Sequence, residues 1–97
     1  MHVISYKYIR EFIEEYPDSH VKLGRWYKWM KKGKYSNLNE LKSKYSDVEY
    51  IGNDRYVFNI GGNKYRLVAL INFKAQRAYI RFIGTHAKYT NTDCKNI

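Results

Sequence analysis

The chain has 97 residues and a formal net charge of +9, from 18 lysines and arginines against 9 acidic residues. This length allows one small domain with one hydrophobic core, so we treat residues 1–97 as a single domain. Hydrophobic residues make up 44% and charged residues 28% of the chain, a balance that excludes a disordered protein. The positive charge favours a polyanionic partner, and composition alone leaves open whether it is RNA, DNA or an anionic membrane surface.

The membrane alternative has the weakest support. No apolar run approaches the roughly 20 residues that a spanning helix needs. The first residues, MHVISYKY, lack the apolar stretch of a signal peptide. Cys94 is the one cysteine and has no second cysteine with which to form an internal disulfide, which fits a reducing cytoplasm. We therefore expect a cytoplasmic protein without a membrane partner.

The N-terminal residues predict a short extended segment and a first helix. Val3 and Ile4 favour a strand or an extended lead-in. Ser5 is a candidate cap for an amphipathic helix that ends near Tyr16, because Pro17 restrains the residue before it from helical geometry.

A second amphipathic helix is predicted between Asp18, a candidate N-cap, and Gly33. Its apolar stripe consists of four residues at helical spacing: Leu23, Trp26, Tyr27 and Met30. The opposite side is cationic, and no acid occurs between Asp18 and Glu40. This side fits a solvated surface and a contact with RNA or the ribosome equally well. Trp29 falls on the cationic side, where we expect a neighbouring element to cover part of it.

The rest of the chain predicts a minor helix and an antiparallel sheet. Residues 36–45 indicate a polar turn and a short surface helix with Asn37 as a candidate cap. From Val48 the hydrophobic period changes to two, which predicts strands over residues 48–51, 56–60, 65–73 and 77–83. The expected fold class is therefore α+β, with two N-terminal helices packed on one face of an antiparallel sheet of about four strands.

Alternation assigns the side chains of the last two strands to two faces. The series expected to face the helices is Leu67, Ala69, Ile71 and Phe73, followed by Ala78, Ile80 and Phe82. The opposite face is expected to carry Lys64, Arg66, Arg77, Tyr79 and Arg81. No acid occurs between Asp54 and Asp93, whereas cations that only solubilise a surface are usually interspersed with acids. This pattern favours contact with a nucleic acid backbone over ordinary exposed strand residues.

The residue types limit the possible chemistry. Carboxylates for Mg²⁺ are absent from this region, and the histidines and the cysteine are scattered, so we expect no metal and no cofactor. RNA cleavage without a metal is still open, because the RNA supplies its own 2′-OH nucleophile. The protein then has to move protons and stabilise a phosphorane. Arginine suits the phosphorane and His86 can exchange protons, whereas Tyr89 can do so only if nearby cations lower its pKa.

Two linked runs, YVFNIGGNKYRLVALINF and YIRFIGTHAKY, resemble HigB-type toxins of bacterial type II toxin–antitoxin systems, within the RelE-like group of mRNA interferases. The opening MHVIS and the central LKSKYSDVEYIGNDRYVFNIGGN are also similar, so the resemblance covers nearly the whole chain. It implies a RelE-like fold with a twisted sheet. It also implies a metal-independent, ribosome-dependent mRNA endonuclease that a cognate helix-turn-helix antitoxin of HigA type neutralises.

The resemblance also implies roles for individual residues. Arg66 matches the phosphate-contacting arginine, and Tyr89 matches the tyrosine beyond the last strand. The implied catalytic residues are Arg66, Arg81, His86 and Tyr89. The expected RNA-binding residues are Lys64, Arg77, Tyr79 and Lys88. Relatives often continue the tyrosine with an aspartate, where this chain has Thr90.

The alternative function is a non-catalytic RNA- or ribosome-binding module that uses the same sheet. DNA binding is a poorer third option, because no recognition-helix pattern stands out in the sequence.

Overall fold

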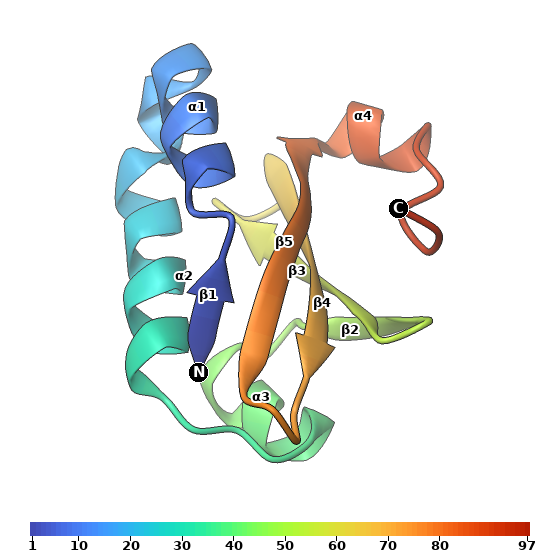
Figure 1. Cartoon of the computed structure of the whole chain (residues 1–97). Coiled ribbons are helices and arrows are strands. Elements are labelled where there is room, and N and C mark those ends of the chain that lie inside the picture. The colour runs from blue at the N-terminus through green and yellow to red at the C-terminus, as the bar shows by residue number, and fades with distance from the viewer.

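A five-stranded sheet forms the centre of the computed structural model, which describes residues 1–97 (Figure 1). Its strands are β1 (His2–Ile4), β2 (Glu49–Gly52), β3 (Arg55–Ile60), β4 (Tyr65–Asn72) and β5 (Arg77–Thr85). The spatial order is β1-β5-β4-β3-β2. Strands β2 to β5 form the predicted antiparallel meander, whereas β1 pairs with β5 in parallel. The sheet is therefore mixed and has one strand more than the sequence predicted.

Two N-terminal helices lie along the sheet, α1 (Lys7–Glu15) and α2 (His20–Lys32), with the short 3-10 helix η1 (Pro17–Ser19) between them (Figure 1). The predicted caps Ser5 and Asp18 are wrong, because neither helix has a side-chain cap and the helices begin after Tyr6 and Ser19. Gly33 ends α2 as predicted. The helices nevertheless fall where the hydrophobic period placed them.

The minor helix α3 (Leu38–Lys44) also forms as predicted. The side chain of Asn37 accepts a hydrogen bond of 3.0 Å from the backbone N–H of Glu40, which satisfies one of the free amides of the first turn. Tyr45 follows α3, and its ring centroid lies 6.0 Å from that of Trp29 in α2. Trp29 is half-buried, so the prediction that a neighbouring element covers part of it is confirmed.

The main core lies between the helices and the sheet. Three of the four predicted stripe residues of α2 are buried, and Tyr27 is half-buried: Leu23, Trp26 and Met30 are at most 2% exposed. Strand β4 contributes the predicted series Leu67, Ala69 and Ile71. Val3 of β1 is also buried in this core. β-Branched side chains favour strands, and burial of this apolar side chain stabilises β1 as the fifth strand. No helix is long and apolar enough to cross a membrane.

A β-bulge in β5 changes the face that its second half presents. Val68 pairs with Phe82, but the next residue of β4, Ala69, pairs with Ile80, so Arg81 is an extra residue. Phe82 therefore packs on the face opposite the helices, in a small cluster with Val68. The prediction that Phe82 shares the face of Ile80 is wrong, because strict alternation does not survive the insertion of one residue.

The segment after β5, for which the sequence predicted only a polar tail, forms a fourth helix, α4 (His86–Thr90). Thr85 caps it, since its side-chain oxygen accepts a 3.2 Å hydrogen bond from the backbone N–H of Lys88. The chain then continues on the side of the sheet away from α1 and α2 (Figure 1). Cys94 is 4% exposed there and packs with Val57 and Val68. The C-terminal segment therefore covers part of the face that we expected to be open.

Candidate functional site

Arg66 lies at the centre of the candidate site. It is in β4, where its cross-strand partners are Asn59 of β3 and Gly84 of β5. Arg66 is 9% exposed, and its guanidinium donates to the carbonyl oxygen of Tyr65 at 3.2 Å and to Oδ1 of Asn63 at 3.4 Å. No carboxylate lies within ion-pair distance of it. A buried guanidinium that is held only by neutral acceptors keeps its full charge available for an anionic ligand.

The ring of Phe82 lies next to this arginine position. A Cβ atom at Gly84 would come within 2.5 Å of Cζ of Phe82, so the ring occupies the space above the glycine. The ring centroid of Phe82 is also 6.2 Å from that of Tyr89 in α4. Phe82 therefore connects the strand position opposite Arg66 with the tyrosine of α4.

Helix α4 carries the two candidate proton-transfer residues. The backbone N–H of His86 donates a 3.2 Å hydrogen bond to the carbonyl oxygen of Lys64, which fixes the start of α4 to the β3–β4 turn. His86 and Tyr89 are three residues apart, so both side chains lie on the same side of this helix. The imidazole of His86 is exposed and makes no hydrogen bond within the protein. Its two ring nitrogens are therefore accessible to a ligand.

The pKa of Tyr89 decides whether its phenol meets the condition that the sequence analysis set for proton transfer. Burial raises the pKa of the Tyr89 phenol, and the charges at Cys94 and Glu49 act in the same direction. The positive charge of Arg66 lowers this pKa but is outweighed. The condition for Tyr89 to act as a base, a pKa lowered by nearby cations, is therefore not met. A phenol that keeps its proton at neutral pH is suited to donate a hydrogen bond or a proton.

Arg81 and Lys88 belong to a hollow beside this site. The hollow has a volume of about 290 Å³ and lies between α1, β5 and α4, where it is lined by Tyr8, Glu11, Phe12, Arg81, Phe82, Ile83 and Lys88. The guanidinium carbon of Arg81 is 6.0 Å from the ring centroid of Tyr79. Arg81, Lys88 and Tyr79 therefore gather along β5 and α4, and Phe82 connects them with Tyr89.

Lys64 is not an uncompensated cation. Its ammonium forms an ion pair with Asp18 of η1, and Asp18 also accepts a 2.7 Å hydrogen bond from the hydroxyl of Tyr65. The hydrogen bond from Lys64 is the main reason why the pKa of Asp18 is lowered. The expectation that the cations of the sheet have no carboxylate partner is wrong for Lys64, because the fold brings η1 to the β3–β4 turn across 46 residues.

Arg77 is the predicted site residue that lies apart from the others. It begins β5, where it pairs with His2 and Asn72, whereas His86 follows the end of that strand. At about 3.3 Å per residue, the nine-residue strand places these two ends roughly 30 Å apart. The structure therefore brings Arg66, His86 and Tyr89 together and leaves Arg77 at the opposite end of the sheet.

Two residues of the site were not found from the sequence. Asn63 holds the guanidinium of Arg66, and its place in the GGN turn three residues earlier is a signal that could have found it. Phe82 had no such signal, because nothing in the sequence marks the bulge at Arg81. No group of three or more His, Cys, Asp or Glu side chains is arranged to hold a metal ion.

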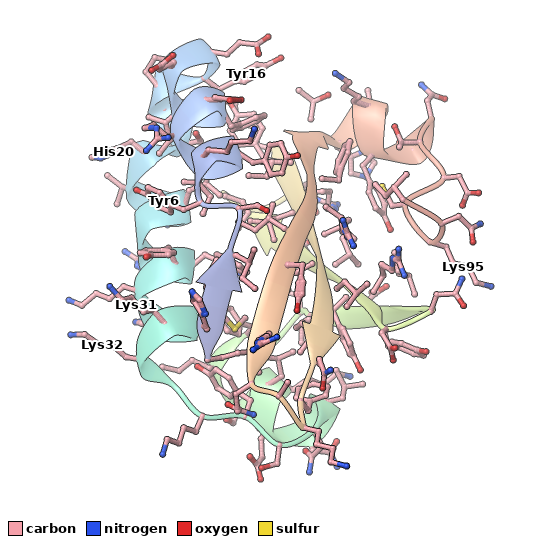
Figure 2. The ribbon with its side chains drawn as sticks, in the orientation of Figure 1. Tyr6, Tyr16, His20, Lys31, Lys32 and Lys95 are labelled. Atoms are coloured by element: carbon pink, nitrogen blue, oxygen red, sulfur yellow. The ribbon has the colours of Figure 1, made fainter.

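Cationic side chains extend beyond the site to several parts of the surface. Figure 2 shows Lys31 and Lys32 pointing away from α2 on one side of the molecule, and Lys95 on the other side. Lys64 is the one lysine or arginine whose side chain has a carboxylate side chain within ion-pair distance. The positive charge is therefore largely uncompensated within the chain.

Comparison with known proteins places this arrangement in a family. Residues 19–92 match the family described as HigB_toxin, the RelE-like toxic component of a toxin-antitoxin system. The chain belongs to this family. It is 34% identical over 92 residues to the mRNA interferase toxin HigB of Escherichia coli K12. The aligned residues make up 92% of this chain and 88% of that relative. The same identity and coverage relate it to the mRNA interferase HigB of Shigella flexneri.

A further relative, the mRNA interferase HigB of Escherichia coli O6:H1, is 31% identical over 91 residues. These matches confirm the HigB-type resemblance found in the sequence. In this HigB-type toxin, the matched residues 19–92 include Arg66, Arg81, His86 and Tyr89. They leave out α1, which forms one wall of the hollow.

Proposed function

We propose that this HigB-type toxin is an endoribonuclease that cuts mRNA on the ribosome, without a metal, and thereby inhibits translation in the cytoplasm. The observation that carries the proposal is the buried Arg66, which has no carboxylate partner and lies beside the helix that carries His86 and Tyr89. The names of the relatives, mRNA interferases, support mRNA as the substrate.

The proposed reaction uses the 2′-OH of the RNA as its nucleophile. The 2′ oxygen forms a bond to the adjacent phosphorus while the bond from phosphorus to the 5′ oxygen breaks, which leaves a 2′,3′-cyclic phosphate and a 5′-OH. Arg66 holds two phosphate oxygens and stabilises the phosphorane. His86 takes the proton from the 2′-OH, because its imidazole is exposed and unbonded. Tyr89 gives its proton to the leaving 5′ oxygen and regains one from solvent.

The remaining cations position the RNA in this scheme. Arg81 and Lys88 hold a phosphate next to the cut, and Tyr79 lies beside Arg81. Lys64 contributes less, because an RNA phosphate has to compete with Asp18 for its ammonium. Arg77 contributes least to the cut itself, since it lies at the far end of β5.

The cognate antitoxin is the second proposed partner. We expect a helix-turn-helix protein of HigA type that covers the cationic face around Arg66 or holds the C-terminal segment, and so blocks access to the ribosome. The uncompensated positive charge supports this, since it attracts an acidic partner surface. A complex that leaves this face open to the ribosome would contradict the proposal.

The test uses purified toxin and ribosomes that carry a defined message. We expect cleavage of the message with 2′,3′-cyclic phosphate and 5′-OH ends, and no cleavage when the nucleotide before the cut carries a 2′-deoxyribose. Arg66→Ala abolishes cleavage, whereas the matched control Arg77→Ala keeps it. Free message without ribosomes stays intact.

A non-catalytic binding module predicts a different result. In that case the wild-type chain inhibits translation while the message stays intact, and Arg66→Ala only weakens a salt-sensitive binding. Ends with a 3′-OH and a 5′-phosphate would also contradict the proposed reaction, because attack by the 2′-OH does not produce them.

A further inference from the structure

The hollow between α1 and β5 is a separate feature of the fold. Strand β1 pairs with β5 only up to Tyr79, the partner of Ile4. From Ile80 onward this edge of β5 has no neighbouring strand, and α1 passes beside it (Figure 1). The resulting space of about 290 Å³ is open to solvent and adjoins α4. It therefore lies next to the proposed cleavage site without being part of it.

The lining of the hollow combines aromatic rings with cations. Tyr8 of α1 is 44% exposed, and Phe82 of β5 is half-buried. Arg81 and Lys88 are exposed cations at the same hollow. Single-stranded RNA is bound by this combination, because bases stack on aromatic rings while cations hold the backbone. The chemistry of the hollow therefore fits a nucleotide.

The charges that line the hollow indicate which part of a nucleotide enters it. Glu11 of α1 is the one acidic residue of the lining and has no ion-pair partner. Its carboxylate repels a phosphate inside the hollow, whereas an uncharged base experiences no such repulsion. The phosphates are then held by Arg81 and Lys88, and the base contacts the exposed ring of Tyr8.

Phe82 connects the hollow with the proposed cleavage site. Its ring lies over Gly84, the cross-strand partner of Arg66, and 6.2 Å from the ring of Tyr89. We propose that the hollow binds an unstacked base of the mRNA next to the cut, with Tyr8 as the ring on which the base stacks and Phe82 at the border toward the cleavage site. This inference rests on the proposed function, because it assigns a subsite of the same RNA.

The test compares three tyrosine variants on ribosomes that carry a defined message. Tyr8→Ala raises the toxin concentration for half-maximal cleavage about tenfold, which is the order expected from the loss of one stacked base. The cleavage rate at saturation stays within about twofold of wild type, because the groups at the phosphate are unchanged. Tyr8→Phe keeps the ring and behaves as wild type. Tyr50→Ala, another exposed tyrosine, on β2, is the matched control and also behaves as wild type.

A second measurement reports the base directly. In a message with 2-aminopurine at a nucleotide flanking the cut, wild-type toxin changes the fluorescence of the probe, and Tyr8→Ala abolishes this change. An unchanged half-maximal concentration together with an unchanged probe signal in Tyr8→Ala would overturn the inference. A Tyr8→Ala variant that cuts normally but escapes its antitoxin would also overturn it, because the hollow would then bind protein.

Failure of the proposed nuclease function and failure of the base subsite give different results. If wild-type toxin cuts no message, the nuclease proposal fails, whereas a probe signal that depends on Tyr8 would still support the base subsite. If wild-type toxin cuts and the signal is the same in Tyr8→Ala, only the base subsite fails. The Tm of Tyr8→Ala is expected to equal that of wild type. An equal Tm shows that removal of this exposed side chain leaves the fold intact.

Discussion

At the residue scale, Arg66 combines a functional advantage with a cost in stability. Burial removes hydration from its guanidinium, and two neutral acceptors replace that hydration only in part. We predict that Arg66→Met abolishes cleavage while the Tm of the free chain is unchanged or raised, because the uncompensated charge is removed. Circular dichroism on heating, together with the ribosome assay, measures both effects. A Tm lower by several degrees would show that Arg66 stabilises the fold.

Asp18 and Lys64 form an exposed ion pair whose effect depends on pH. The pKa of Asp18 is lowered by hydrogen bonds from Lys64 and Tyr65, so its contribution to stability is present above the ordinary range of aspartate. That contribution is lost as the pH falls through the lowered pKa. We predict that Asp18→Asn lowers the Tm slightly at pH 7, and that the two proteins converge as the pH falls through the lowered pKa of Asp18. A difference in Tm that persists at the lowest pH would indicate another cause.

Arg66, Lys64 and Tyr89 show which features of the candidate site could be predicted from the sequence and which could not. Arg66 was predicted because its charge pattern and its motif point to the same position, and its role in the site stays a prediction. The partner of Lys64 was not, since Asp18 is 46 residues away in the chain and only the tertiary fold brings the two together. The raised pKa of Tyr89 depends on its burial against the cluster of Val57, Val68 and Cys94, which the sequence did not predict.

At the scale of elements, α2 and β5 show why some predictions succeeded. The apolar stripe of α2 has one period throughout, so its buried face was predicted correctly. Strand β5 changes its pattern at Arg81, where one inserted residue reverses the faces of Phe82 and Gly84. Helix α4 has only five residues and a cap, which is too short for a periodic signal. The long regular pattern of α2 therefore made its prediction secure, whereas the errors in β5 and α4 lie where a pattern is interrupted or too short.

The second half of β5 leads to a prediction about Gly84. An added Cβ would come within 2.5 Å of the ring of Phe82, and the ring can move because it is the end of a side chain. We predict that Gly84→Ala displaces Phe82, lowers cleavage about tenfold and lowers the Tm by a few degrees. Gly24→Ala in α2 is the matched control, since no atom lies within 4 Å of its added Cβ. This control gains about 0.5–1 kcal/mol of stability, because alanine favours a helix interior. Equal activity in both variants would show that the position of the Phe82 ring is unimportant.

At the scale of the whole molecule, the sheet separates two functions. The helices bury its first face and provide the main core, while the second face carries Arg66 and a small cluster closed by Cys94. The site is therefore built on strands that the core holds in place, with α4 fixed to them through the backbone of Lys64 and His86. A chain this small can dedicate a buried charge to function because the opposite face supplies its stability.

The net charge of +9 leads to a prediction about ionic strength. The logarithm of the affinity for ribosomes should fall linearly with the logarithm of the salt concentration, because the bound cations release counterions from RNA. Lys88→Ala should make this slope less steep by about 0.7, the value for one lost contact with single-stranded RNA. The double variant Lys31→Ala/Lys32→Ala is the control, since these side chains lie at the end of α2 that is far from α4 (Figure 2). It should keep the wild-type slope, and a less steep slope would instead show that the cationic side of α2 contacts ribosomal RNA.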